Sequence, residues 1–298
     1  MKSGIVLIGP GRVGAAISKR LHEADHPVVA VIGRNQQRAS DAVDFIGCDP
    51  SLATTDLTLA RRGKIVLLAI PDDQISGMAQ RLQETIGLSR ETTLVHFSGL
   101  QPANIMKVAG SDCATISIHP LLPFADRDMA TASLTDCPCA IEGDSIALPL
   151  AQELVGAMGG KAFHLDTDAK ALYHTAACIA SNYLVTITAS ARDLLVRCGL
   201  DQQQAMELLT PIQRATSDNL IRLGPEAALT GPIARGDVGT VNKHLLALKE
   251  KAPDFCGLYR SLGEQTIALA TASERLSKEQ ISKLQKILTD EDGADSDC

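Results

Sequence analysis

One loop constrains the fold of this chain more than any other feature of its 298 residues. Residues 9–14 read Gly-x-Gly-x-x-Gly, follow a short apolar run at residues 4–8 and open a helical pattern that extends to about residue 24. In such a turn the first glycine permits a tight turn, the second lets a ligand approach the backbone, and the third lets the helix pack closely on the strand. The sequence therefore predicts a β-strand followed directly by an α-helix.

The same loop has the spacing of a phosphate-binding site. Free amide groups at a helix N-terminus, together with the helix dipole, favour the binding of an anion. We therefore expect a dinucleotide whose phosphates contact the loop formed by Gly9, Pro10, Gly11, Arg12, Val13 and Gly14. The alternative is an ordinary turn without a ligand, but the strand, the spacing and the helix together favour the dinucleotide.

The end of the second predicted strand, Val28–Ile32, indicates which dinucleotide is bound. In NAD enzymes this strand usually ends in Asp or Glu, which binds the ribose 2′-hydroxyl. Here the strand is followed by Gly33, Arg34 and Asn35, and Arg38 comes about one helical turn later. A guanidinium at this place can form paired hydrogen bonds with a 2′-phosphate, so we expect NADP(H). Asn35 is also expected to cap the helix that follows, and a solvated Arg34 is the plainer alternative.

Short apolar runs alternate with helical patterns through the first half of the chain. Further runs at residues 65–70, 93–97 and 114–118, with two possible edge strands at 140–142 and 162–165, predict a parallel sheet covered by helices on both faces. Helices alone are expected after residue 166, with Thr167 as an N-cap. Their breaks are predicted at Pro211, Gly224, Pro225, Gly231, Pro232, Pro253 and Gly263.

The fold class is therefore α/β, with an N-terminal Rossmann sheet followed by an all-α domain. We place the dinucleotide-binding domain at residues 1–166, a helical domain for substrate binding and dimerisation at 167–289, and an acidic, disordered tail at 290–298. Five acids of this tail account for most of the net charge of −7, so the body is nearly neutral. It lacks a basic block, and aromatic residues make up 3% of the chain, which argues against a nucleic-acid partner.

Residues 171–191 contain no Asp, Glu, Lys or Arg, a length that would permit a membrane span. Seven polar side chains in this stretch argue against burial in lipid. A helix that is apolar on most sides must be covered by protein, and we expect a second subunit to cover it, giving a homodimer. The first apolar run is too short for a secretory signal, and the eight cysteines form no CxxC pair. These features favour a cytoplasmic protein with reduced thiols and without a metal site.

Polar and turn-forming residues follow several of the predicted strands. Ligands of an open parallel sheet bind beyond the carboxyl ends of its strands. We expect Ile70 and Pro71 to lie behind the cofactor ribose, and Ser98 and His119 to flank the nicotinamide and a small anionic substrate. For any one of these residues, loop formation alone is an equally good explanation.

The helical region offers a second set of candidates. His174, Cys178, Ser181, Asn182 and Val185 share one stripe of a predicted continuous helix. Buried polar groups need partners, and a substrate would be one, although such a histidine is more often a satisfied core group. Between later helices, Asp237 is expected to cap a helix, while Arg235 and Thr240 are candidates to point toward the substrate.

Together these stretches resemble bacterial proteins that pair a Rossmann-like domain with a C-terminal domain of unknown function. The superfamily has a helical domain like that of 6-phosphogluconate dehydrogenase and includes ketopantoate, pyrroline-carboxylate and β-hydroxyacid enzymes. The resemblance rests on residues 9–14, 69–73, 96–99, 119–121, 174–183, 230–232 and 235–237. It implies an NADPH-dependent reductase, with ketopantoate as the best single substrate. Its relatives generally carry a lysine four residues before the helix asparagine, where this chain has Cys178.

The resulting hypothesis is hydride transfer from NADPH to the carbonyl carbon of a small 2-oxo acid. The carbonyl oxygen gains negative charge and needs a hydrogen-bond donor and then a proton. We assign His174 as that donor, Asn182 as the group that orients the carbonyl, and Arg235 as the ligand of the substrate carboxylate, assisted by Ser98 or Thr240. The alternatives are reduction of a cyclic imine and a non-catalytic protein that senses NADP(H).

Overall fold

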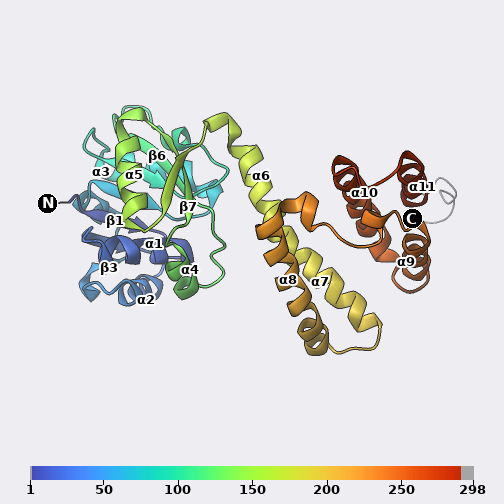
Figure 1. The fold of residues 1–298 in the computed structure, drawn as a ribbon. Coiled ribbons are helices and arrows are strands. Elements are labelled where there is room, and N and C mark those ends of the chain that lie inside the picture. Colours follow the sequence, from blue (N-terminus) through green and yellow to red (C-terminus); the bar gives the residue numbers. More distant parts are fainter. Residues whose placement is uncertain (1, 290–298) are drawn as a thin grey trace. The chain divides into compact units, whose positions relative to one another are not determined.

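The computed structural model describes residues 2–289 and divides into two compact units, Met1–Ser181 and Asn182–Cys298. Each unit is described by itself, and Figure 1 gives the order of their elements. The acidic tail predicted at residues 290–298 lies outside the described residues. The first unit extends to Ser181 and so includes one helix that follows the domain boundary expected at residue 166.

Within residues 2–289 the strands form one eight-stranded sheet of order β3-β2-β1-β4-β5-β6-β7-β8. All neighbours pair in parallel except β6 and β7, which are antiparallel. The predicted parallel sheet is therefore confirmed, and β3 is an additional short strand. The strand bounds are β1 Ile5–Ile8, β2 Val28–Ile32, β3 Ala53–Thr54, β4 Ile65–Leu68, β5 Thr93–His96, β6 Ala114–Pro120, β7 Pro138–Gly143 and β8 Lys161–His164.

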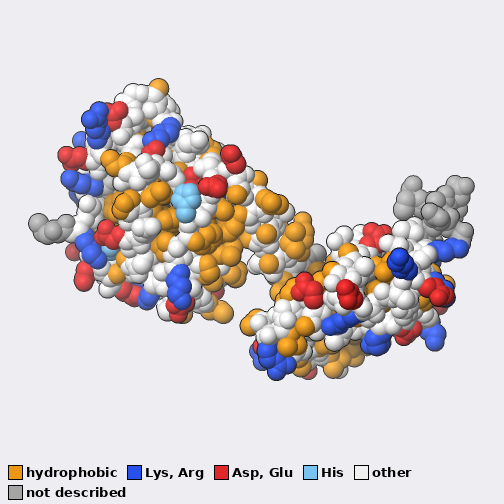
Figure 2. Space-filling model, turned by 45° about the horizontal axis from the view of Figure 1, so that its top comes forward, with side chains coloured by type: hydrophobic (Ala, Val, Ile, Leu, Met, Phe, Trp, Pro, Cys, Tyr) orange, Lys and Arg blue, Asp and Glu red, His pale blue; other side chains and the backbone are white. Residues whose placement is uncertain are grey.

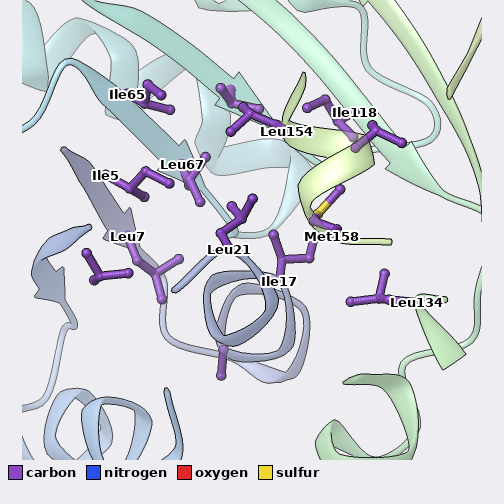
Figure 3. Close-up of a cluster of buried hydrophobic side chains, with 14 of the residues drawn as sticks. Ile5, Leu7, Ile17, Leu21, Ile65, Leu67, Ile118, Leu134, Leu154 and Met158 are labelled. Atoms are coloured by element: carbon purple, nitrogen blue, oxygen red, sulfur yellow. The ribbon is translucent and has the colours of Figure 1, made fainter. Parts of the chain in front are cut away.

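Two apolar cores, one on each face of the sheet, explain why the central strands read as unbroken apolar runs. In β1 the side chains of Ile5 and Leu7 join one core, and those of Val6 and Ile8 join the other. The first core, part of which Figure 3 shows, is completed by helices on one face, and the second by a helix on the opposite face. These helices are α1 Arg12–Glu23, α2 Gln36–Ile46 and α5 Leu148–Ala157 on the first face, and α3 Ile75–Ile86 on the second.

The remaining helices differ from the expected pattern in three places. The continuous helix expected through residues 171–191 is wrong, because the chain departs from helical geometry at Ser181. Pro211 does not end a helix but lies inside α8, and Gly263 lies inside α10, where it packs against Leu288. Gly224 does mark a kink, since its φ is +76°. The bounds are α4 Arg127–Ser133, α6 Lys170–Ala180, α7 Asn182–Arg197, α8 Gln202–Ala228, α9 Val238–Lys251, α10 Cys256–Ala272 and α11 Lys278–Thr289.

The uncharged stretch at residues 171–191 is long enough for a membrane span, which would also require a helix with the hydropathy of membrane helices. Among residues 2–289, no helix combines the length and the apolar character needed to cross a membrane. The break at Ser181 shortens the uncharged stretch into parts of two helices, each with polar side chains.

Candidate functional site

A cavity of about 540 Å³ lies beyond the carboxyl ends of β1, β2 and β4. Its size falls in the range of small-molecule sites, and its place is the edge at which parallel sheets bind ligands. Most of the residues expected to bind the dinucleotide meet here. The lining comprises Ile8, Gly9, Pro10, Gly11, Ile32, Gly33, Arg34, Asn35, Arg38, Thr55, Leu57, Ala69, Ile70, Pro71, Gln74, Met78 and Arg81.

The three glycines of the loop serve different purposes. Gly9 has a φ of +91°, which other residues rarely adopt, and a side chain there would collide with the backbone at Ala69. A Cβ at Gly14 would lie 2.6 Å from the carbonyl oxygen of Gly9, so this glycine lets α1 pack on the sheet. Gly11 has an ordinary φ of −83°, and no described atom lies within 4 Å of the place where its Cβ would be. The fold needs the first and third glycines, whereas the second leaves open space beside the start of α1.

Positive charge gathers at the end of β2. Arg34 and Arg38 line the cavity and are exposed, and Arg81 of α3 lines it as well. Asn35 caps α2 as predicted, because its side chain accepts hydrogen bonds from the amides of Gln37 and Arg38 at 2.8 and 3.3 Å. The cap brings the first turn of α2, and with it the guanidinium of Arg38, to the same cavity. Arg81 is not among the predicted cofactor ligands, because it lies far from β2 along the chain.

Four of the expected cofactor ligands are not part of this cavity lining. Arg12 donates a hydrogen bond to the carbonyl of Ala125 at 2.6 Å, and Val13 and Gly14 form the first turn of α1 beneath the loop. Ser98 is buried farther along the sheet edge, after β5. The cofactor contacts assigned to these four residues remain predictions.

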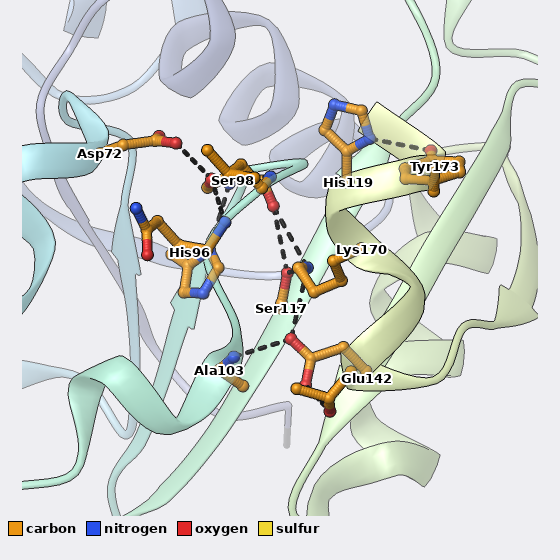
Figure 4. Close-up of polar contacts among 12 residues, drawn as sticks. Asp72, His96, Ser98, Ala103, Ser117, His119, Glu142, Lys170 and Tyr173 are labelled. Atoms are coloured by element: carbon orange, nitrogen blue, oxygen red, sulfur yellow. Dashed lines mark hydrogen bonds and ion pairs between the residues drawn. The ribbon is translucent and has the colours of Figure 1, made fainter. Parts of the chain in front are cut away.

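A second cluster surrounds the backbone at Gly99, after β5. His119, near the end of β6, places its Nδ1 2.8 Å from the hydroxyl of Tyr173 in α6 (Figure 4). The rings of His119 and His174 have centroids 6.1 Å apart. A Cβ at Gly99 would lie 2.6 Å from Cδ2 of His174 and 2.8 Å from Nε2 of His119, so both imidazoles pack against this glycine. The structure thus brings two predicted site residues together and adds Tyr173 to them.

Burial controls the charge of His119. Burial, with smaller Coulombic contributions from His174 and Lys170, lowers the pKa of this imidazole to about 4. His119 is consequently neutral near pH 7, with one ring nitrogen as a donor and the other as an acceptor. The hydroxyl of Tyr173 also stays protonated, since burial raises its pKa to about 12. A neutral imidazole joined to a neutral phenol can hold a hydrogen bond to a ligand without supplying a charge.

Ser98 shapes the turn that carries Gly99. Its hydroxyl donates to a carboxylate oxygen of Asp72 at 2.6 Å and accepts from the amides of Leu100 and Gln101 at 3.1 and 2.8 Å. Its amide donates to Nδ1 of His96 at 3.1 Å. Three partners therefore engage the hydroxyl for which a substrate role is predicted, and they fix the turn.

Next to this turn lies a buried ion pair that the sequence analysis missed. The ammonium of Lys170 is 3.3 Å from a carboxylate oxygen of Glu142, donates to the hydroxyl of Ser117 at 2.8 Å and contacts the carbonyl of Ser98 at 3.4 Å (Figure 4). Thr167 is not the N-cap that the sequence suggests. Its hydroxyl donates to the other oxygen of Glu142 at 3.2 Å, and Asp166 occupies the cap position of the short 3₁₀ turn there, without a side-chain hydrogen bond.

The other predicted site residues belong to the second unit. Asn182 is the exposed first residue of α7, and Arg235 is exposed at the end of a 3₁₀ turn at Ile233–Arg235. Asp237 caps α9 as predicted, and Thr240 donates its hydroxyl to this carboxylate at 2.7 Å. The stripe expected to join His174 to Asn182 is interrupted at Ser181, so the two residues lie on different helices and in different units.

Comparisons with known proteins agree with this architecture. A model described as a Rossmann-like domain matches residues 1–120, and one described as a domain of unknown function (DUF2520) matches residues 137–266. No match was found among curated proteins.

Three solved structures illustrate the shared fold. A protein from Bacteroides fragilis assigned as an NADP oxidoreductase is 22% identical with a TM-score of 0.74, covering 90% of this chain and 98% of its own. A protein from Thermotoga maritima is 25% identical with a TM-score of 0.71, covering 91% and 99%. Pyrroline carboxylate reductase from Plasmodium falciparum, solved with NADP bound, is 12% identical with a TM-score of 0.58, covering 96% and 98%. The chain thus joins a Rossmann-like domain to a C-terminal DUF2520 domain, the combination that its motifs resemble.

Proposed function

We propose that this protein is an NAD(P)-dependent oxidoreductase that uses NADP(H). The observation that carries the proposal is the cavity at the glycine loop, where open space at Gly11 adjoins the guanidinium groups of Arg34 and Arg38. The first amides of α1 would hold the pyrophosphate, and the two arginines would hold the 2′-phosphate. When bound, the nicotinamide ring supplies or accepts a hydride. The names of the Bacteroides and Plasmodium proteins support this class of reaction.

The two imidazoles lie on the same edge of the sheet as the cavity. β4 ends at the cavity, and β5 and β6 are the next strands. Gly99 lies in the turn after β5, and His119 lies near the end of β6. A cofactor that extends from the glycine loop along this edge reaches the residues that follow β5 and β6. His119 and His174 are therefore the groups available to a substrate beside the nicotinamide.

The substrate that these groups suit best is a small anionic carbonyl compound, for which a 2-oxo acid such as ketopantoate is our specific proposal. During reduction the carbonyl oxygen gains negative charge, and a hydrogen-bond donor stabilises it. We assign this donor and the subsequent proton to His174, with the neutral imidazole of His119 beside it. Asn182, Arg235 and Thr240 remain proposed ligands of the carbonyl and carboxylate.

Reduction of a cyclic imine is the second candidate, and the state of Lys170 favours it. This ammonium is committed to Glu142 and Ser117 inside the first unit, so it does not protonate a substrate oxygen. An imine that binds already protonated needs less help from a general acid. The hydride acceptor would then be the carbon of a C=N bond rather than of a C=O bond.

The decisive experiment combines calorimetry with a substrate panel. We expect the purified protein to bind NADPH more tightly than NADH and to oxidise NADPH, measured by its absorbance, with a 2-oxo acid or a cyclic imine. His174→Ala should lower kcat strongly without changing the affinity for NADPH, whereas His164→Ala, at an exposed histidine of β8, should leave both unchanged. If the protein binds neither NADPH nor NADH, it is not an NAD(P)-dependent oxidoreductase. Tight binding without turnover of any substrate would favour a sensor of NADP(H).

We also propose that the protein is a homodimer formed through the helical unit. Several large apolar side chains of α7 and α8 are exposed, and Figure 2 shows hydrophobic side chains on the surface of this unit. Leu208 is 59% exposed and Ile221 86% exposed, and large exposed apolar patches often mark protein interfaces. Light scattering should report a dimer that Leu208→Glu or Ile221→Glu weakens. Met129→Glu, at an exposed site of α4, is the control, and a monomeric wild type would reject the proposal.

A further inference from the structure

Lys170 and Glu142 form a buried ion pair whose presence requires an explanation. Lys170 is 2% exposed and Glu142 4% exposed. Removing both charges from water costs more than their attraction in many proteins returns, and an apolar pair of similar volume is often at least as stable. Burial indeed lowers the pKa of Lys170, while the charge of Glu142 acts in the opposite direction. Stability alone is therefore a poor reason for this pair.

The contacts of the pair show what it holds together. The ammonium of Lys170 contacts the carbonyl of Ser98, the residue immediately before Gly99. Glu142 accepts a hydrogen bond from the amide of Ala103 at 2.7 Å and another from the hydroxyl of Thr167. The pair thus joins the segment after β5 to β7 and to the turn that leads into α6.

The position of Lys170 in α6 connects the pair to the imidazoles. Lys170 is the first residue of α6, and Tyr173 and His174 follow it at spacings of three and four residues, which places all three on one face of the helix. That face meets the sheet, because Tyr173 bonds to His119 and His174 packs on Gly99. Lys170 therefore ties the start of α6, which carries His174, to the carbonyl of Ser98 and to Ser117 of β6, the strand that carries His119.

We propose that Lys170 and Glu142 are positioning residues, which hold the first turn of α6 and the turn at Gly99 in register so that His119 and His174 keep their mutual geometry. The inference rests on the proposed function, since it concerns the groups assigned to the substrate. Neither residue lines the cavity, so neither is expected to contact the phosphates of the dinucleotide. Loss of the pair disturbs the reacting groups and spares the binding of NADPH.

The charge of Lys170 also acts on the imidazoles directly, which gives a second measurement beside kcat. Its Coulombic effect lowers the pKa of His119 and of His96, in addition to burial. The other ionisable groups around this cluster are Asp72, Cys137, Cys139, Glu142, Tyr173 and His174. Replacing Lys170 with a neutral residue should raise the pKa of His119 while every other group remains.

The test uses the full-length protein and three variants: Lys170→Met, Glu142→Gln and the double variant. In Lys170→Met we expect a kcat roughly 10- to 100-fold lower, because small misplacements of reacting groups have effects of this size. The Kd for NADPH should change less than about twofold, and the His119 pKa, followed by NMR, should rise. The double variant should regain stability, because no buried charge is left unpaired, while its kcat stays low. Lys64→Met with Glu91→Gln, an exposed ion pair of 2.8 Å, is the matched control.

Two outcomes would overturn the inference. If the double variant recovers kcat together with stability, the pair is only structural. If Lys170→Met keeps kcat, the pair positions nothing, and any rise in the His119 pKa reports only the lost charge. Should the wild type turn over no substrate, NMR contacts between the rings of His119 and His174 and the α-protons of Gly99 still decide, since the proposal requires that Lys170→Met alters them. Failure of the proposed function is recognised separately, as a wild type that binds no dinucleotide.

Discussion

Replacing the second and third loop glycines with alanine should separate folding from ligand binding. At Gly14 the added Cβ would lie 2.6 Å from the carbonyl oxygen of Gly9 and 2.8 Å from side-chain carbons of Ala69 and Leu7. Carbon contacts normally begin near 3.5 Å, so these atoms must move by more than half an ångström. Such overpacking costs about 1–3 kcal/mol, and the better helix propensity of alanine offsets about 1 kcal/mol. We expect Gly14→Ala to lower the free energy of unfolding by up to about 2 kcal/mol.

Gly11→Ala should behave in the opposite way. Its backbone conformation suits alanine, and no described atom obstructs the new methyl group. Loss of a favourable N-cap residue and the lower entropy of the unfolded chain nearly cancel, so the free energy of unfolding should change by less than about 0.5 kcal/mol. The methyl group enters the space beside the start of α1, where the pyrophosphate would lie. The Kd for NADPH should therefore rise at least about tenfold, which corresponds to about 1.4 kcal/mol.

Thermal unfolding and calorimetry with NADPH measure the two effects independently. A loss of 2 kcal/mol lowers Tm by roughly 4–8 °C in a domain of this size. Gly77→Ala is the control, because Gly77 of α3 also has no described atom within 4 Å of its missing Cβ and does not line the cavity. The reasoning is refuted if Gly11→Ala binds NADPH as tightly as the wild type, or if it loses as much stability as Gly14→Ala.

Three further expectations follow from the same geometry. Arg34→Ala with Arg38→Ala should weaken NADPH binding at least about 100-fold in calorimetry but leave NADH nearly unchanged, because hydrogen bonds to charged groups contribute about 1.5–3 kcal/mol each. Equal losses for both dinucleotides would contradict a 2′-phosphate site. Gly99→Ala should lower kcat, with NADPH affinity retained, because its Cβ would displace both imidazoles; an unchanged kcat would exclude the imidazoles from the reaction. His96 is fully buried and its pKa falls from 6.5 to about 4, mainly through burial, so the unfolded chain binds the proton more readily. As the pH drops from above 6.5 to about 4, this group should therefore lower the free energy of unfolding by roughly 3 kcal/mol. In urea titrations, His96→Asn should reduce this dependence of the free energy of unfolding on pH. An unchanged pH dependence would show that His96 is not buried in its neutral form.

Local sequence patterns predicted the dinucleotide cavity well because its parts are local. The glycine loop, the cap at Asn35 and the arginine after β2 each begin within three residues of a strand end, and parallel pairing brings the strand ends to one edge. Patterns of this kind require only that neighbouring strands run in the same direction. Arg81 was missed because α3 reaches the cavity from the side, through residues in its second turn.

The buried ion pair could not be predicted in the same way, since it depends on long-range pairing. Glu142 lies opposite Ser117 only because β7 runs antiparallel to β6, and the sequence does not specify that direction. One signal was nevertheless present. Glu142 follows a run of apolar residues in a predicted strand, and Lys170 directly precedes the uncharged stretch of 21 residues. A charged residue beside an apolar segment is costly to bury without a partner, so two such residues are candidates for an ion pair with each other.

The helical region shows the limit of pattern analysis most clearly. Its periodicity continues through residue 181, yet the backbone at Ser181 leaves helical geometry, with φ −113° and ψ −66°. Proline is usually a stronger signal for a break, but Pro211 lies inside α8. The apolar pattern within each helix therefore predicts neither the break at Ser181 nor the continuity through Pro211.

The helix α6 is anchored to the sheet at its start and is followed by the helical unit. α6 begins at Lys170, where a buried charge ties it to β7 and to the turn after β5, and it ends at Ser181, where the compact unit also ends. Its first turn carries Tyr173 and His174 against Gly99, whereas its last turns carry no comparable anchor among residues 2–289. His119 and His174 are thus held by the unit that contains the cofactor cavity. The geometry of these two residues depends on the carbonyl of Ser98 and the carboxylate of Glu142, which hold the first turn of α6.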